Sequence, residues 1–270
     1  MKSNLASIFR IQRYLNDIKY PDAYRIAREI SKFLSKKRSV SEDDIFNRLH
    51  KDEPWEYISG NVDFCGNIFK VNKSTLIPRI ETEQLVYECK KLIEKDNIKN
   101  IVDVGTGTGC IIISLAKLLS KKVPYSFYAT DISSEILKIA KYNEIKILEQ
   151  KNVKWIKSNL IQKLPKVNKD TIIIANLPYI PTQQYENLDR SVKGYEPRLA
   201  LDGGENGLKY YTLLFEQILT KNLKVKYIYI ETEESIFNQT KKLVKKYFPE
   251  TRINGIKDSL NRNRFIKISF

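Results

Sequence analysis

A glycine-rich loop stands near the middle of the chain, Asp103-Val104-Gly105-Thr106-Gly107-Thr108-Gly109, between a short apolar run and an apolar helical stretch. Glycines at such a strand-to-helix turn let the backbone bend tightly and approach a ligand where a Cβ would collide. The pattern therefore predicts a nucleotide-type binding loop at the carboxyl end of a first strand.

The residues around this loop separate three uses of it. A phosphate-binding loop ends in Gly-Lys-Ser or Gly-Lys-Thr, whereas Cys110 follows Gly109 here. A dinucleotide fingerprint needs glycine at its sixth position, which is also Cys110. The acid two residues before Gly105, Asp103, instead suits the ammonium group of a methionine moiety. We therefore expect S-adenosyl-L-methionine as the cofactor.

The pattern on both sides of the loop predicts an α/β fold. Short apolar runs alternate with amphipathic stretches from residue 99 onward, which is typical of a doubly wound parallel sheet. Seven strands are expected at 101–104, 126–130, 153–156, 171–175, 225–230, 252–255 and 265–270. Helices are expected at 82–92, 110–119, 135–148, 207–219 and 234–248.

The first sixty residues show helical rather than alternating periodicity. Apolar residues recur every three to four positions over 5–18, 21–34 and 41–49, which predicts three packed helices. Between 60 and 76 the apolar period changes to two, which predicts a β-hairpin. We divide the chain into a helical domain (1–60), a hairpin linker (61–78) and an α/β domain (79–270).

Polar residues at the ends of the second and third strands suit the rest of the cofactor. Asp131 follows Gly109 at about the twenty-residue spacing of a carboxylate that binds ribose hydroxyls, with capping of the next helix as the alternative. Asn159 is placed to hydrogen-bond the adenine amine, and Leu160 to pack on its ring. The predicted cofactor site comprises Asp103, Gly105, Thr106, Gly107, Thr108, Gly109, Asp131, Asn159, Leu160 and Asn176.

The fourth strand ends in the turn Asn176-Leu177-Pro178-Tyr179. An amide or aromatic-amine nitrogen is a poor nucleophile, so an enzyme must orient it and accept its N–H groups. The Asn176 oxygen and the Leu177 carbonyl offer two acceptors, and Tyr179 can cover the planar group. Pro178 keeps Leu177 out of the α region. A simple turn is the alternative for the tetrapeptide alone.

Composition narrows the other possibilities. Three cysteines, Cys65, Cys89 and Cys110, lack metal-ligand spacing, and His50 is the single histidine, so we expect no disulfide framework, no metal and no histidine-based triad. No apolar run reaches the roughly 18 residues of a membrane span, so we expect a cytoplasmic protein without membrane contact. The formal charge of +15 is spread along the chain, which indicates compositional bias but leaves a weak ribosome or RNA contact open.

The chain resembles the peptide chain release factor glutamine methyltransferases over essentially its whole length. Besides the glycine loop and the Asn-x-Pro-Tyr turn, two segments carry the likeness: Leu76-Ile77-Pro78-Arg79-Ile80-Glu81-Thr82-Glu83 and Tyr195-Glu196-Pro197-Arg198-Leu199-Ala200-Leu201-Asp202-Gly203-Gly204. The resemblance implies a helical domain that grips a release factor, a hairpin linker, and a seven-stranded, Rossmann-like class I methyltransferase domain.

The resemblance also implies a reaction and its residues. The glutamine of the Gly-Gly-Gln motif in class 1 release factors would be methylated on its side-chain nitrogen, in support of translation termination. Gly105 to Gly109 and Asp131 would bind the cofactor, and Leu160 would flank its adenine. The substrate-binding residues would be Asn176, Leu177, Pro178 and Tyr179, of which Asn176, Pro178 and Tyr179 form the predicted catalytic group.

The sequence departs from the family pattern in four places. Leu177 replaces the first proline of the usual Asn-Pro-Pro-Tyr, and Ile80 stands where proline is usual. Asn159 replaces a common aspartate, and the segment 231–233 lacks the usual glycine. Two alternatives therefore stay open. Asn-Leu-Pro-Tyr also occurs in adenine N(6) dimethyltransferases acting on ribosomal RNA, so the first alternative is an adenine N(6) methyltransferase acting on RNA or DNA. The second is a non-catalytic adaptor of the translation machinery, which the fold also suits.

Overall fold

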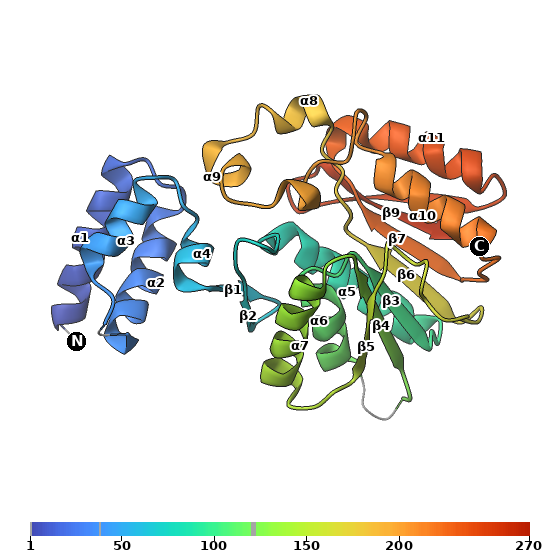
Figure 1. Cartoon of the computed structure of the whole chain (residues 1–270), viewed down its shortest axis with the longest axis horizontal. Coiled ribbons are helices and arrows are strands. Elements are labelled where there is room, and N and C mark those ends of the chain that lie inside the picture. The colour runs from blue at the N-terminus through green and yellow to red at the C-terminus, as the bar shows by residue number, and fades with distance from the viewer. Residues whose placement is uncertain (1, 38, 120–122) are drawn as a thin grey trace. The chain divides into compact units, whose positions relative to one another are not determined.

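The computed structural model describes residues 2–37, 39–119 and 123–270 (Figure 1). Contacts divide the chain into two compact units, Met1–Gly60 with Asp189–Tyr195, and Asn61–Leu188 with Glu196–Phe270. Among the described residues, no helix combines the length and the apolar character needed to cross a membrane.

The first unit is helical. It consists of α1 (Lys2–Asp17), α2 (Ala23–Lys36), α3 (Glu42–Leu49) and α4 (Trp55–Ser59), which pack around a core that includes Ile11, Ile30 and Trp55. Ser41 caps α3 by accepting a hydrogen bond from the Asp44 amide at 3.0 Å. The sequence periodicity predicts α1 to α3, whereas the five residues of α4 are too few to show it.

A segment from much later in the chain belongs to the same unit. Asp189–Tyr195 contains the short helix α9 (Arg190–Lys193). The Tyr195 hydroxyl donates to the Lys51 carbonyl at 2.7 Å, and Arg190 approaches Asp52 at 3.8 Å. Nothing in the sequence pattern indicates this association, because it joins residues about 140 positions apart.

The second unit begins with the antiparallel hairpin β1 (Asn61–Phe64) and β2 (Asn67–Lys70), followed by α5 (Ile80–Lys95). Its main sheet has the order β5-β4-β3-β6-β7-β9-β8. The strands are β3 (Asn100–Val104), β4 (Ser126–Asp131), β5 (Val153–Lys157), β6 (Thr171–Ala175), β7 (Tyr227–Glu231), β8 (Arg252–Lys257) and β9 (Asn263–Ser269). The seven-stranded α/β sheet predicted from the sequence is thereby confirmed, but it is not wholly parallel, because β9 runs antiparallel to both β7 and β8.

Helices cover both faces of this sheet (Figure 1). One face packs against α5, α6 (Cys110–Leu118) and α7 (Ser134–Leu148), and the other against α10 (Lys209–Thr220) and α11 (Phe237–Tyr247). The predicted helix 207–219 begins only at Lys209, because Gly207 has φ +74° and lies outside helical geometry. The predicted helix 234–248 divides into a 3-10 turn (Glu234–Ile236) and α11. The four residues of α8 (Thr182–Tyr185) were not predicted.

The chain order reverses between β3 and β6, which lie side by side in parallel register with Val104 opposite Ala175. Open α/β sheets bind their ligands at such a switch point, outside the carboxyl ends of the strands. The glycine loop follows β3, and the turn Asn176–Tyr179 follows β6. The topology therefore brings the two predicted motifs together.

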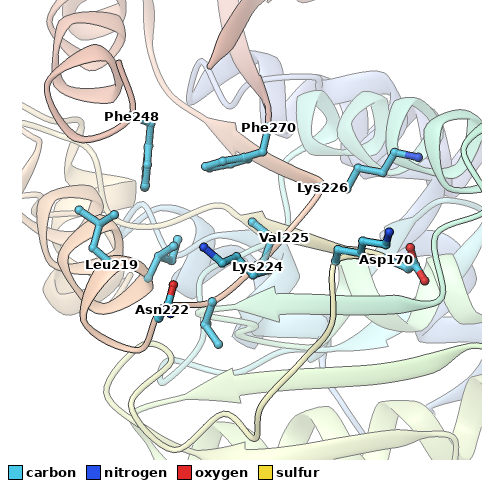
Figure 2. A pocket seen from close by; sticks show the side chains of 11 residues that line it. Asp170, Leu219, Asn222, Lys224, Val225, Lys226, Phe248 and Phe270 are labelled. Atoms are coloured by element: carbon cyan, nitrogen blue, oxygen red, sulfur yellow. The ribbon is translucent and has the colours of Figure 1, made fainter. Parts of the chain in front are cut away.

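A pocket of about 680 Å³ lies at the opposite edge of the sheet (Figure 2). Asp170 and Lys226, which line it, immediately precede β6 and β7, so the pocket is at the amino ends of these strands. Phe248 and Phe270 also line it, and their rings meet edge to face with centroids 5.1 Å apart. Its position separates it from the residues that the sequence predicts to be functional.

Candidate active site

The glycine loop packs directly against the turn that follows β6. A Cβ added to Gly105 would lie 2.7 Å from a methyl carbon of Leu177, and the φ of Gly105, +71°, disfavours other residues. The Gly105 and Thr106 amides donate to the Thr130 carbonyl at the end of β4, both at 2.9 Å. These contacts fix the loop between the ends of three strands.

Asp103 is 1% exposed, at the end of β3. Its Oδ2 accepts a hydrogen bond from the Thr106 hydroxyl at 2.5 Å, whereas its Oδ1 is buried and has no partner within the described residues. Burial raises the pKa of Asp103 to about 7, and the nearby Asp131 carboxylate adds to the increase. A buried carboxylate oxygen without a donor suits a cationic ligand group, as the ammonium of S-adenosyl-L-methionine would be.

Asp131 holds the loop from the end of β4. Its Oδ2 accepts from the Gly107 amide at 3.1 Å and its Oδ1 from the Ser133 amide at 3.0 Å. The cap of α7 is Ser133, whose hydroxyl accepts from the Ile136 amide, so Asp131 is not the N-cap residue. A carboxylate oxygen can accept more than one hydrogen bond, so Asp131 retains acceptor capacity for ribose hydroxyls.

The two residues predicted to flank the adenine differ in environment. Leu160 is buried and has φ +50°, a left-handed conformation that is strained for a leucine. Asn159 is exposed, and it lies with Leu160 in the segment that follows β5. Thr108 is buried, with a hydroxyl that has no partner among the described residues. Gly109 immediately precedes α6.

The turn Asn176–Tyr179 is held by side chains from two helices. The Asn176 Nδ2 donates to the Thr82 hydroxyl on α5 at 3.3 Å, and the Leu177 amide donates to the Tyr211 hydroxyl on α10 at 3.3 Å. Gly203 packs closely against the turn. A Cβ at this position would lie 2.7 Å from the Pro178 carbonyl oxygen, so the close packing requires glycine. The turn is therefore fixed by tertiary contacts as well as by its proline.

One buried acid beside this turn was not predicted from the sequence. Glu231 ends β7, the neighbour of β6, and is 1% exposed. Its carboxylate accepts from the Thr82 hydroxyl at 2.8 Å and from the Tyr179 hydroxyl at 3.4 Å. Burial raises the pKa of Glu231 to about 7, although the hydrogen bond from Thr82 opposes the shift. The available signal was an acid at the end of an apolar strand, the position that Asp103 and Asp131 also occupy.

The two segments that carry the family resemblance meet beside the site. The Arg79 guanidinium pairs with Glu196 Oε1 at 2.5 Å, and the Ile77 amide donates to Glu196 Oε2 at 3.1 Å. These residues are more than a hundred positions apart in the sequence. His50, by contrast, is exposed and follows α3 as its C-cap residue.

Comparison with known proteins agrees with this geometry. A family model described as the ubiE/COQ5 methyltransferase family matches residues 81–179. The chain is 34% identical over 233 residues to the release factor glutamine methyltransferase of Flavobacterium psychrophilum, which covers 84% of this chain and 79% of the relative. It is 33% identical over 256 residues to that of Bacillus subtilis, with coverage of 90% and 87%.

Solved structures show the same fold at low sequence identity. The human METTL16 catalytic domain in complex with an RNA hairpin superimposes with a TM-score of 0.57 at 11% identity, covering 87% of this chain and 93% of that one. The human methyltransferase 10 domain containing protein gives 0.52 at 16% identity, covering 75% and 89%. These two likenesses concern the fold alone.

Sheet, loop and relatives together define the class: the chain is an S-adenosylmethionine-dependent methyltransferase with a class I sheet. The identity of 34% and 33% to the two relatives, over most of each sequence, narrows the class to one family. The chain belongs to the release factor glutamine methyltransferase family. Neither the adenine methyltransferase nor the adaptor alternative is favoured by these relatives.

Proposed function

We propose that the chain methylates the side-chain nitrogen of the glutamine in the Gly-Gly-Gln motif of class 1 peptide chain release factors. One observation carries the assignment of the site. Among the described residues, neither the Asn176 Oδ1 nor the Leu177 carbonyl accepts a hydrogen bond, whereas the Nδ2 of Asn176 and the amide of Leu177 both have acceptors. Two neighbouring free acceptors match the two N–H groups of a primary amide.

The chemistry follows from that match. The lone pair of an amide nitrogen is delocalised, so orienting it and accepting its N–H groups lowers the barrier to attack. S-adenosyl-L-methionine supplies the electrophilic methyl group. Asn176 and Leu177 hold the glutamine amide, and Tyr179 covers it. The nitrogen would gain the methyl group as the S–CH3 bond of the cofactor breaks, which leaves S-adenosylhomocysteine, and the nitrogen would lose one proton to solvent.

The cofactor residues predicted from the sequence keep their roles in this proposal. Asp103 would accept from the ammonium group, and Asp131 from the ribose hydroxyls. Leu160 would pack on the adenine, and Asn159 would bind its amine. The partly unsatisfied carboxylate of Asp103 and the glycine loop that Asp131 fixes support these roles.

The protein partner belongs to the proposal as well. We assign release-factor binding to the helical unit, including Asp189–Tyr195, because that segment begins only ten residues after the turn. Release factors act on ribosomes, so we place the reaction in the cytoplasm. The charge of +15 suits a weak additional contact with ribosomal RNA.

A transfer assay tests the proposed function. The full chain is incubated with methyl-labelled S-adenosylmethionine and either a purified class 1 release factor or ribosomal RNA. Label is expected on the release factor, on the glutamine of Gly-Gly-Gln by peptide mass spectrometry, and absent when that glutamine is replaced by alanine. Label on RNA alone would assign the chain to the adenine methyltransferases instead.

A further inference from the structure

We propose that Glu231 is a positioning residue that fixes which end of the Asn176 amide faces the substrate. This inference rests on the proposed function, since it assumes that Asn176 accepts an N–H of a glutamine. Its basis is a chain of hydrogen bonds from Glu231 through Thr82 to Asn176. The direction of each bond in that chain is determined by the one before it.

The first link starts at the carboxylate. An ionised carboxylate has acceptors only, so the contact of 2.8 Å between Thr82 Oγ1 and Glu231 Oε2 must use the hydroxyl hydrogen of Thr82. Thr82 is 2% exposed, on α5, where water does not compete for that hydrogen. Thr82 then has only lone pairs left to offer to its other neighbour.

The second link orients the asparagine. Asn176 meets Thr82 Oγ1 at 3.3 Å, and a lone pair there can be satisfied only by the Nδ2 group. The opposite orientation would place the Asn176 Oδ1 against another acceptor. Glu231 therefore dictates, through Thr82, that the Oδ1 of Asn176 is the end left for the substrate.

Glu231 also connects to the remainder of the turn. Its Oε1 accepts from the Tyr179 hydroxyl at 3.4 Å, and its backbone carbonyl accepts from the Tyr211 hydroxyl, which in turn accepts from the Leu177 amide at 3.3 Å. Burial and the charge of Glu231 raise the pKa of Tyr179, so its hydroxyl stays a donor. Three residues of the turn are thus tied to this one strand end.

Protonation of Glu231 would remove the constraint. A protonated Glu231 can donate its own hydrogen to the Thr82 oxygen. The Thr82 hydroxyl is then free to donate to Asn176 Oδ1, which requires the Asn176 amide to rotate. The Nδ2 group would then face the N–H of the substrate, so that two donors oppose each other. Among the described residues, the charged and titratable groups facing Glu231 are Glu81 on α5, Arg264 on β9, Tyr179 in the turn and Tyr211 on α10. Because burial raises the pKa of Glu231 to about 7, the reversal falls within an accessible pH range.

The test replaces the carboxylate by its neutral isostere in the full chain. In Glu231→Gln we expect kcat for release-factor methylation to fall by about 100-fold, the loss typical of a misplaced reacting group. The dissociation constant for S-adenosylmethionine, measured by calorimetry, should change by less than about 2-fold. The wild-type kcat should decline below pH 7, and this acid limb should be absent from the variant.

A matched control is available at another buried acid of the same unit. Glu144 is 2% exposed and accepts three hydrogen bonds, from the amides of Asn152 and Val153 and from the Trp155 indole. Glu144→Gln should lower the melting temperature but keep kcat and its acid limb. A kcat in Glu231→Gln within about 3-fold of wild type, with the acid limb retained, would overturn the proposal.

A second pair of variants keeps the proposal testable if Glu231→Gln does not fold. Thr82→Val removes the connecting hydroxyl and should lower kcat as Glu231→Gln does, whereas Thr82→Ser restores the hydroxyl and should restore the rate. Equal kcat in both Thr82 variants would overturn the hydrogen-bond chain. If the wild-type chain itself leaves release factors unmethylated, the proposed function has failed.

Discussion

The side chain of Asn176 has an Nδ2 group that donates to Thr82 and an Oδ1 that accepts no hydrogen bond among the described residues. Asn176→Ala removes the free acceptor but leaves Asp103, Asp131 and the glycine loop in place. We expect kcat to fall by roughly 10² to 10³-fold, the range for loss of one oriented hydrogen-bonding group in an active site. The dissociation constant for S-adenosylmethionine should change little. A methyl-transfer assay measures kcat, and calorimetry measures the dissociation constant.

Asn152→Ala is the control for that substitution, because Asn152 is an exposed asparagine in the same unit, away from the turn. It should leave both quantities unchanged. Near-normal turnover in Asn176→Ala would remove the residue from its assigned role.

The raised pKa of Asp103 should make the stabilisation of the protein by its cofactor depend on pH. Its pKa is raised to about 7 by burial, so the folded apoprotein binds its proton more tightly than the unfolded chain does. The stability of the apoprotein therefore falls as pH rises from about 4 to 7. A bound ammonium group would favour the ionised carboxylate and reverse the local penalty.

The increase in melting temperature on adding S-adenosylmethionine should accordingly be larger at pH 8 than at pH 6. Thermal unfolding with and without the cofactor at both pH values measures this increase. Asp103→Asn should bind more weakly and should lose most of the difference between the two pH values. An equal increase at both pH values in the wild type would argue against an ammonium contact at Asp103.

At the scale of elements, the segments before α5 and after α9 are joined by Glu196, which is 5% exposed. Glu196→Ala leaves the Ile77 amide and the Arg79 guanidinium without this acceptor, so the free energy of unfolding should fall by about 1–3 kcal/mol. The second segment also carries Gly203, which supports the Pro178 carbonyl. The KM for the release factor should therefore rise, while cofactor affinity stays near wild type.

Urea unfolding and steady-state kinetics measure these two effects of Glu196→Ala. The control is Glu216→Ala on α10, which removes an exposed acceptor of the Tyr247 hydroxyl on α11. It should alter neither quantity appreciably. An unchanged KM for the release factor in Glu196→Ala would show that the joined segments do not position the turn.

Elements also show how far the sequence alone can lead. The strands and longer helices were predictable because their apolar periods are local properties. The short helices α4, α8 and α9 were not, since four or five residues show no period. Glu231 escaped notice because its importance comes from β7 lying beside β6, which is a property of sheet order. The pairing of Ile77 and Arg79 with Glu196 is likewise long-range.

At the scale of the whole molecule, the two units have separate cores. Ile11, Ile30 and Trp55 lie in the core of the helical unit, whereas the sheet has its own apolar clusters on both faces. We therefore expect the cofactor residues of the sheet unit to keep their arrangement when the helical unit is absent. The segment Asp189–Tyr195 would lose the partners it has within the helical unit.

Deletion of residues 1–60 tests the division of labour between the units. We expect affinity for the release factor to fall by at least about 10-fold, and the dissociation constant for S-adenosylmethionine to change by less than about 3-fold. Circular dichroism and thermal unfolding establish that the shortened chain is folded before either affinity is measured. Tyr195→Phe in the full chain removes the hydroxyl that donates to the Lys51 carbonyl and should produce a smaller loss in the same direction. Equal affinity of the full and shortened chains for the release factor would move partner recognition to the sheet unit, where the segments around Glu196 would then have to supply it.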